Sequence, residues 1–189
     1  MRLAPSALVS LAVGALLWAS PREAQALERQ HHLGLDPTLA MLKVDDKSTL
    51  SVGVGLGAHY TYGINDQFNF LAEVNWSRVA ANQQQDEVTS PHTRPADVAH
   101  ASAGVGYVID VLRFVPYVGL LLGGYRLSGG TLDSALLLPG AELVVGLDYQ
   151  LSRQWAVGIA GQQHLLFTKA STYPSYTTVL LRFEYMWGF

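Results

Sequence analysis

Alternation between apolar and polar residues dominates the chain after residue 26. From Leu50 to Ile64 every second residue is apolar, and the residues between them are glycine, serine, threonine or histidine. The last stretch, from Val179 to Phe189, alternates in a similar way. Because successive side chains of a β-strand point to opposite faces, both patterns predict strands with one apolar face. Weaker copies complete a set of eight predicted strands, at residues 33–43, 50–64, 68–76, 99–109, 114–127, 141–149, 155–159 and 179–189.

The connections between these strands alternate in length. Short turns at residues 64–67, 110–113 and 151–153 contain asparagine, aspartate or serine, which favour tight turns. Longer segments at residues 80–96, 128–138 and 168–175 fall between them. Short turns at one end and long loops at the other are typical of outer-membrane barrels. We therefore predict an all-β fold, an eight-stranded antiparallel transmembrane up-and-down β-barrel with both chain ends on the short-turn, periplasmic side.

A soluble lipocalin-like barrel or a β-sandwich would show the same alternation with its apolar face inside. Two features of composition favour the membrane barrel. The non-apolar face is rich in glycine, alanine and serine, as expected for a narrow interior, and it carries few charges. Aromatic residues lie near predicted strand ends, as in the interfacial girdles of membrane proteins. The periplasmic girdle is predicted to contain Tyr62, Phe68, Phe114, Trp155 and Trp187, and the outer girdle Trp76, Tyr125, Phe167 and Tyr176.

The first 26 residues have the three parts of a secretory signal peptide. Arg2 is the positive region, residues 8–18 are mainly apolar, and Ala24-Gln25-Ala26 is a small-x-small cleavage site. The apolar stretch is shorter than the roughly 18–20 residues of a spanning helix, and no later apolar run reaches that length. We expect cleavage after Ala26, a barrel domain at residues 27–189, and a location in the outer membrane of a Gram-negative cell envelope.

Composition narrows the chemistry. The chain of 189 residues has no cysteine, so thiolate metal sites, cysteine nucleophiles and disulfides are excluded. Its net charge of −3 gives no excess of positive charge of the kind that binding to nucleic-acid phosphates requires. His31 and His32 are adjacent and would point to opposite faces of a strand, and His59, His92 and His100 lack metal-ligand spacing. We therefore expect no metal, no other cofactor and no nucleic-acid partner.

The C-terminal segment carries the most specific pattern. The last predicted strand ends in Phe189 and has aromatic or apolar residues at alternate positions, and Gly-x-Gly or Tyr-x-Gly recurs at residues 53–55 and 117–119. On these features the chain after residue 26 resembles the small outer-membrane β-barrel proteins, the group of the OmpA membrane domain, OmpX and OmpW-like proteins. The resemblance implies that outer-membrane lipid, periplasmic chaperones and the barrel-assembly machinery are the partners of a monomeric barrel. It also implies that the assembly signal is formed by Val179, Leu181, Phe183, Tyr185, Trp187 and Phe189.

One dipeptide departs from this pattern. Asp36-Pro37 falls inside the first predicted strand, although proline cannot donate to a strand ladder and a closed barrel has no free edge. We expect the first strand to start later or to carry a bulge there.

Charged and polar residues should line the lumen if the apolar faces point to lipid. An eight-stranded barrel is just wide enough for side chains to fill it, and buried charges there must pair. We expect Arg126 and Arg182 to be bridged by Glu73, Glu142 or Glu184 and to plug the lumen. The predicted lumen charge network is Glu73, His100, Arg126, Glu142, Asp148, His164, Arg182 and Glu184, and Gln162 is assigned to the same face.

Two other functions stay open at this point. Four carboxylates against two arginines in the lumen would favour a narrow, porin-like, cation-preferring pore. A lipid-modifying enzyme of the lipid A deacylase kind would place a histidine two residues before a serine, but His164 is followed by two leucines. Ser171 and Ser175 lie in or beside the last loop, and no triad spacing is visible. We expect no catalytic residues and a structural or interaction role, with the loop at residues 80–96 as the best contact surface.

Overall fold

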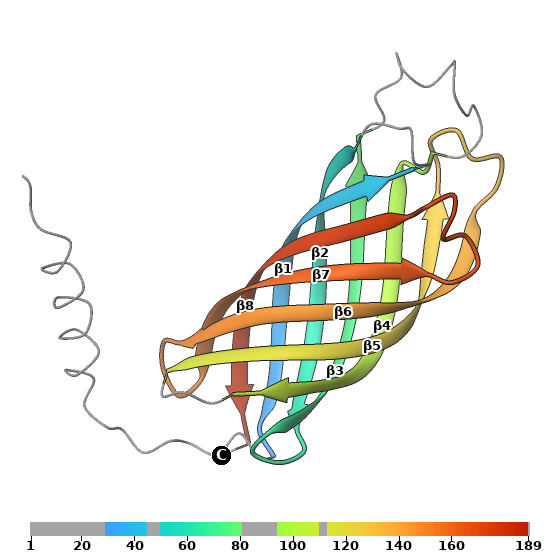
Figure 1. The fold of residues 1–189 in the computed structure, drawn as a ribbon. Coiled ribbons are helices and arrows are strands. Elements are labelled where there is room, and N and C mark those ends of the chain that lie inside the picture. The colour runs from blue at the N-terminus through green and yellow to red at the C-terminus, as the bar shows by residue number, and fades with distance from the viewer. Residues whose placement is uncertain (1–28, 45–49, 81–93, 110–112, 189) are drawn as a thin grey trace, which may run out of the picture.

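Eight antiparallel strands form one closed barrel in chain order, and the last strand pairs with the first (Figure 1). The computed structural model describes residues 29–44, 50–80, 94–109 and 113–188. The strands are β1 (His31–Lys43), β2 (Ser51–Gly63), β3 (Phe68–Val79), β4 (Asp97–Val108), β5 (Phe114–Ser128), β6 (Leu136–Gln150), β7 (Trp155–Leu166) and β8 (Ser175–Trp187). The predicted fold class is confirmed.

Two strands extend further toward the loops than their alternation indicated. β7 continues to Leu166, and β8 begins already at Ser175. In these added parts Gln163 and Thr177 occupy outward positions, and Thr177 Oγ1 donates to Gln163 Oε1 across the two strands at 2.7 Å. The backbone ladder therefore continues where polar residues interrupt the apolar outer face, which reappears at Leu165.

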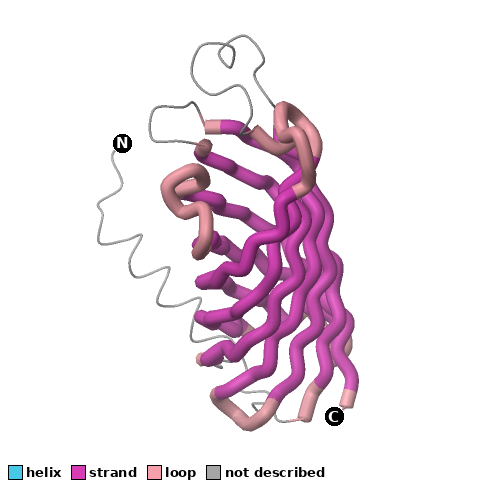
Figure 2. The backbone as a smooth tube through the Cα atoms, turned by 90° about the vertical axis from the view of Figure 1, so that its right-hand side faces the viewer, coloured by secondary structure: helices cyan, strands magenta, loops and turns pink. Residues whose placement is uncertain are grey.

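The short connections gather at one end of the barrel and the longer ones at the other (Figure 2). The short-turn end holds residues 64–67 and 151–154, together with the start of β1 and the end of β8. Side chains close both turns. Asn65 Oδ1 accepts from the backbone N–H groups of Gln67 and Phe68 at 2.9 and 2.8 Å, and Ser152 Oγ accepts from that of Trp155 at 3.2 Å. Such local bonds are the reason these residue types favour turns.

The apolar face of the strands points outward. In β2, Val54 and Leu56 are 69% and 54% exposed, and the inward positions that alternate with them are glycines, at 53, 55 and 57, with no side chain to fill the lumen. Leu181 and Phe183 of β8 are exposed in the same way, whereas Arg182 between them is buried. A soluble lipocalin-like barrel or sandwich has its apolar face inside, so this arrangement is the inverse of such a fold. In water the whole apolar band would be exposed to solvent, as it is in barrels whose outer face contacts lipid.

An aromatic girdle surrounds the short-turn end. Rings from neighbouring strands contact one another there, with centroids 5.5 Å apart for Phe68 and Tyr107 and 5.2 Å apart for Trp155 and Tyr185. Trp187 stacks on His31 at 5.4 Å. These contacts lie near the predicted periplasmic boundary, and they continue around the barrel through Phe114 and Tyr149.

Three residues of the other half face the opposite way from the prediction. Tyr125 and Tyr176 were assigned to the outer girdle, but both are fully buried inside the barrel. Arg126, assigned to the lumen, is exposed on the outer face. The two errors in β5 have one cause. From Leu120 to Leu122 this strand is apolar at odd and even positions alike. Its sequence therefore does not reveal whether the odd or the even positions face the lumen.

Pro37 lies within β1, and the strand begins at His31 rather than after the proline. β1 keeps one continuous register with β2, from His31–Tyr62 to Leu42–Ser51. The pairing with β8 stops after Leu35–Phe183 and resumes at Thr38–Leu180 in the same register. The predicted later start or bulge is therefore wrong. Proline is accommodated by a gap in one ladder, without an inserted residue.

The predicted signal peptide, its cleavage site after Ala26 and Phe189 lie outside the described residues, as does most of the loop at residues 80–96. No helix in the described part of the chain combines the length and the apolar character needed to cross a membrane.

Candidate functional site in the barrel lumen

The interior of the barrel is layered along the strands. Inward-facing positions of β8 read, from the loop end, Tyr176, Thr178, Leu180, Arg182 and Glu184. Apolar, polar, apolar and ionic layers thus follow one another. The apolar layer nearest the loops contains Ala40, Leu42, Val44, Val79, Val98, Tyr125, Leu127, Leu138, Leu166, Tyr173 and Tyr176. The second apolar group contains Leu71, Val108, Val115, Tyr117, Leu121, Val144, Ala160 and Leu180.

The ionic layer surrounds the guanidinium of Arg182. Its Nη2 lies 2.9 Å from Glu184 Oε1, its Nη1 3.5 Å from Asp148 Oδ2, and its Nε 3.8 Å from Asp36 Oδ1. Nη1 also donates to the Tyr117 hydroxyl, and the guanidinium carbon lies 4.9 Å from the centre of that ring. One cation therefore serves three carboxylates, all of them buried or nearly so.

Two histidines complete this layer. His59 Nδ1 donates to the Asp36 carboxylate at 2.7 Å, and His59 Nε2 lies 3.1 Å from Glu184 Oε1. His32 Nδ1 lies 3.0 Å from the second oxygen of Glu184. Asp36 and His59 were not in the predicted network. Asp36 was missed because the neighbouring proline cast doubt on the strand, and His59 because only its metal-ligand spacing was considered.

The polar layer lies closer to the loops, and its hydrogen bonds and ion pairs among the described residues involve histidine, glutamine, serine and threonine. His100 Nε2 lies 2.9 Å from Glu73 Oε1, and Gln162 Nε2 donates to Glu73 Oε2 at 2.7 Å. Ser102 Oγ donates to Glu142 Oε2 at 3.0 Å. The other oxygen of Glu142 is buried without a hydrogen-bond partner. Such an atom calls for an explanation, because buried polar atoms in proteins nearly always have partners.

A chain of hydrogen bonds determines the tautomer of His164. The Gln162 amide donates through Nε2 to Glu73, so its oxygen is the acceptor for Thr178 Oγ1, at 2.6 Å. A hydroxyl has one proton to donate, so Thr178 must accept from His164 Nε2, at 3.0 Å. The neutral ring then carries a lone pair on Nδ1, which lies 3.0 Å from the Tyr125 hydroxyl.

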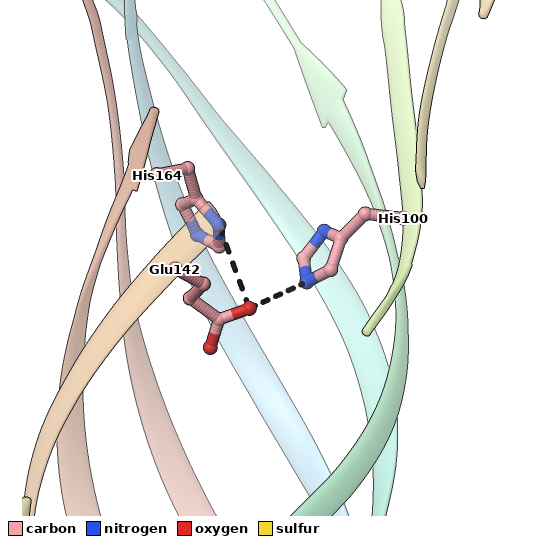
Figure 3. A group of neighbouring side chains, drawn as sticks. All are labelled: His100, Glu142 and His164. Carbon is pink, nitrogen blue, oxygen red and sulfur yellow. Dashed lines mark ion pairs between the residues drawn. The ribbon is translucent and has the colours of Figure 1, made fainter. Parts of the chain in front are cut away.

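Three side chains from different strands meet in this layer (Figure 3). Glu142 Oε2 lies 3.7 Å from His164 Nδ1 and 3.9 Å from His100 Nε2, and all three ligand atoms lie within 4.8 Å of one another. All three side chains are fully buried. Sequence spacing cannot reveal such a group, because β4, β6 and β7 each contribute one member.

Two small cavities lie on either side of Arg182. One, of about 20 Å³, lies between Glu73 and Gln162 on the polar side and Asp36, His59 and Arg182 on the ionic side. The other, also about 20 Å³, lies at the far side of Arg182 beside Asp148 and Glu184. Each has room for about one water molecule.

Seven of the eight predicted network residues face the interior, and only Arg126 does not. They belong to two separate groups and not to one network. Arg182 is bridged by Glu184 and Asp148, whereas Glu73 and Glu142 lie with the histidines of the polar layer.

The surroundings of His164 differ from those of a serine hydrolase. Its two ring nitrogens lie beside the hydroxyls of Tyr125 and Thr178, and Glu142 is at 3.7 Å. Ser175 begins β8, one position before Tyr176, and is only partly buried. The described residues therefore place no serine hydroxyl against His164.

A closed eight-stranded barrel with an apolar outer band, an aromatic girdle and a polar interior is an outer-membrane β-barrel. The chain belongs to the outer membrane protein beta-barrel domain family, which it matches over residues 9–186. Membership of this family implies a location in the outer membrane.

Solved structures show the same fold. Neisserial surface protein A is 16% identical, with a TM-score of 0.62 over 84% of this chain and 97% of that one. The attachment invasion locus protein Ail of Yersinia pestis is 14% identical, with a TM-score of 0.57 over 85% and 99%. The N-terminal barrel of Pseudomonas aeruginosa OprF is 11% identical, with a TM-score of 0.58 over 86% and 100%. A sequence comparison with curated proteins gives no match.

Proposed function

We propose that this protein is a non-catalytic outer-membrane barrel with a structural or interaction role, whose lumen is closed and whose outer loops contact partners. The observation that carries the proposal is the ionic layer. Arg182 and three carboxylates span the interior from β1, β6 and β8, and they leave cavities of only about 20 Å³ on either side.

The apolar layer near the loops adds a second closure. Leu42, Leu127 and Leu166 are at most 2% exposed, and they pack with Tyr125 and Tyr176 across the lumen. A hydrated ion would have to pass this layer without polar partners, which is costly. Two closures in series favour a barrel that does not conduct.

The outer loops provide the remaining surface. Residues 129–135 and 167–174 form a hollow of about 220 Å³ that contains Asp133, Lys169 and Tyr173. Loops of rigid scaffolds are common sites of contact. The name of Ail, an attachment invasion locus protein of the same fold, supports a contact role for the loops of this chain.

The test is single-channel recording of the full chain, folded and inserted in a planar bilayer, with a heat-dependent gel shift as proof of folding. We expect silence from the wild type and from Arg126→Gln, whose side chain lies on the outer face. Steady openings of the wild type would overturn the closed lumen. Silence leaves the loops as the functional surface.

A narrow cation-preferring pore is the second candidate. It is favoured by an excess of interior carboxylates. Among the described residues, the polar and ionic layers contain one arginine, Arg182, and five carboxylates, those of Asp36, Glu73, Glu142, Asp148 and Glu184. Acidic linings attract cations. Cation-selective openings that change with Glu142→Gln would establish this candidate in place of the closed barrel.

A further inference from the structure

We propose that His100, Glu142 and His164 form a binding site for a divalent transition-metal ion of the Zn²⁺ class, inside the lumen. Their ligand atoms form a triangle with sides of 3.7 and 3.9 Å and a third side of at most 4.8 Å. The centre of that triangle is about 2.5 Å or less from each atom, against metal–ligand bonds of about 2.0–2.2 Å. A shift of a few tenths of an ångström in each side chain brings the three atoms to bonding distance.

The charge of Glu142 is the first argument for an ion. Its carboxyl is fully buried, and its nearest ionisable neighbours are two imidazoles and Glu73. The imidazole nitrogens are too far for hydrogen bonds, and Oε1 has no hydrogen-bond partner. The carboxylates of the ionic layer contact a guanidinium, whereas Glu142 Oε2 has as its neighbours the Ser102 hydroxyl and the two imidazoles. A divalent ion at the centre of the triangle would bind the ionised form of this buried carboxyl and stabilise it.

The orientation of His164 is the second argument. Its Nε2–H donates to the Thr178 hydroxyl, which donates to the Gln162 amide oxygen, and the Gln162 amide nitrogen donates to Glu73. This chain leaves Nδ1 without a proton, 3.7 Å from Glu142 Oε2, and without an ion it accepts from the Tyr125 hydroxyl at 3.0 Å, which an ion must displace. Protein metal sites use the same device, since a ligand histidine usually donates its other N–H to an oxygen that fixes its tautomer.

His100 supplies the third ligand through Nε2. This nitrogen lies 2.9 Å from Glu73 Oε1 and donates to it when no ion is bound. A metal binds the neutral ring through an unprotonated nitrogen, so coordination requires the tautomer whose proton is on Nδ1 and replaces the hydrogen bond to Glu73.

The donor set determines the class of ion. Two imidazoles and one carboxylate match catalytic-type zinc sites and related first-row metals, whereas Ca²⁺ and Mg²⁺ prefer oxygen alone. The apolar layer containing Leu42, Leu127 and Leu166 covers the site on the loop side. We therefore expect the ion to enter most readily while the barrel folds.

The test is to fold the full chain in detergent with Zn²⁺ present, remove free metal by dialysis, and measure bound zinc by atomic spectroscopy. We expect one zinc per folded barrel and a higher temperature for the gel-mobility transition than in metal-free protein. Folding with Co²⁺ instead should give a visible absorption band typical of four-coordinate cobalt, which reports the geometry directly.

Glu142→Gln and His164→Gln are the decisive variants, and His31→Gln is the matched control. His31 lies in the aromatic girdle, away from the site. We expect both site variants to fold, to lose the bound zinc and to lose the metal-dependent temperature shift, while His31→Gln keeps both. Metal-free Glu142→Gln should be at least as heat-resistant as metal-free wild type, since glutamine has nearly the same shape, can still accept from Ser102 and is always uncharged.

Two results would overturn the proposal. One is folded wild type with no stoichiometric zinc, which would mean that Glu73 and Glu142 are satisfied by a shared proton. The other is zinc that survives Glu142→Gln and disappears with His31→Gln, which would place the binding at the short-turn end of the barrel. Neither result depends on whether the lumen conducts.

Discussion

Replacing Arg182 by methionine should cause the largest single loss of stability in the lumen. Methionine keeps much of the side-chain volume but removes the guanidinium that contacts Glu184, Asp148 and Asp36. All four side chains are at most 13% exposed. Breaking a buried ion pair by removing one partner costs about 3–5 kcal/mol, because the remaining charge is buried without compensation. Three carboxylates remain here, so we expect a loss toward the upper end of that range.

The measurement is urea-induced unfolding of the barrel in lipid vesicles, followed by tryptophan fluorescence and by gel mobility. Arg126→Met is the control, because it makes the same chemical change on the outer face, where we expect an effect within about 1 kcal/mol. The double variant Arg182→Met with Glu184→Gln should recover part of the loss, with a coupling of about 1–3 kcal/mol.

A loss below about 1 kcal/mol for Arg182→Met would refute this reasoning. Ion pairs of that strength occur in contact with water, so the ionic layer would be hydrated. The lumen would then be open at this level, and the closed barrel proposed above would have to be abandoned as well.

Two further predictions concern the walls of the lumen. A methyl group added at Gly104 would meet the carbonyl oxygen of Leu120, so Gly104→Ala should destabilise the barrel by about 1–3 kcal/mol in urea unfolding. Gly161→Ala, where a methyl group meets open space, should change stability by less than about 0.5 kcal/mol, and equal effects would contradict the steric argument. Thr178→Val removes the acceptor of His164 Nε2–H. The zinc concentration that half-loads the barrel during folding should therefore rise by about tenfold or more, and an unchanged concentration would show that His164 needs no such support.

Period-two alternation predicted the barrel well wherever one face of a strand is apolar and the other is not. β2 and β8 satisfy this condition, and their orientation was assigned correctly from residues such as Val54 and Phe183. β5 does not, because Leu120, Leu121 and Leu122 occupy both faces in succession. Its inward parity is decided by the register with β4 and β6, which a single sequence does not show.

The candidate site was harder to predict for a similar reason. Lumen residues were identified only by whether they occupy odd or even positions in a strand. That alternation gives the face of the strand, but it does not tell which residues of different strands lie at the same height along a tilted barrel. His100, Glu142 and His164 meet because antiparallel register and strand tilt bring β4, β6 and β7 together. Motif spacing detects metal sites within one or two adjacent elements, and this group has no such spacing.

The gap in the β1–β8 ladder affects how the barrel closes. These two strands come from opposite ends of the chain, and His32 and Glu184 are separated by 152 residues. Contacts of such long range form late in folding, because much chain entropy must be lost before they contribute. At Asp36 and Pro37 the seam lacks ladder pairing, and the side chains of Asp36 and Arg182 face each other there at 3.8 Å. Closure of the barrel therefore depends partly on charge attraction across the seam, so high salt should slow the last step of folding more than the earlier pairing of neighbouring strands.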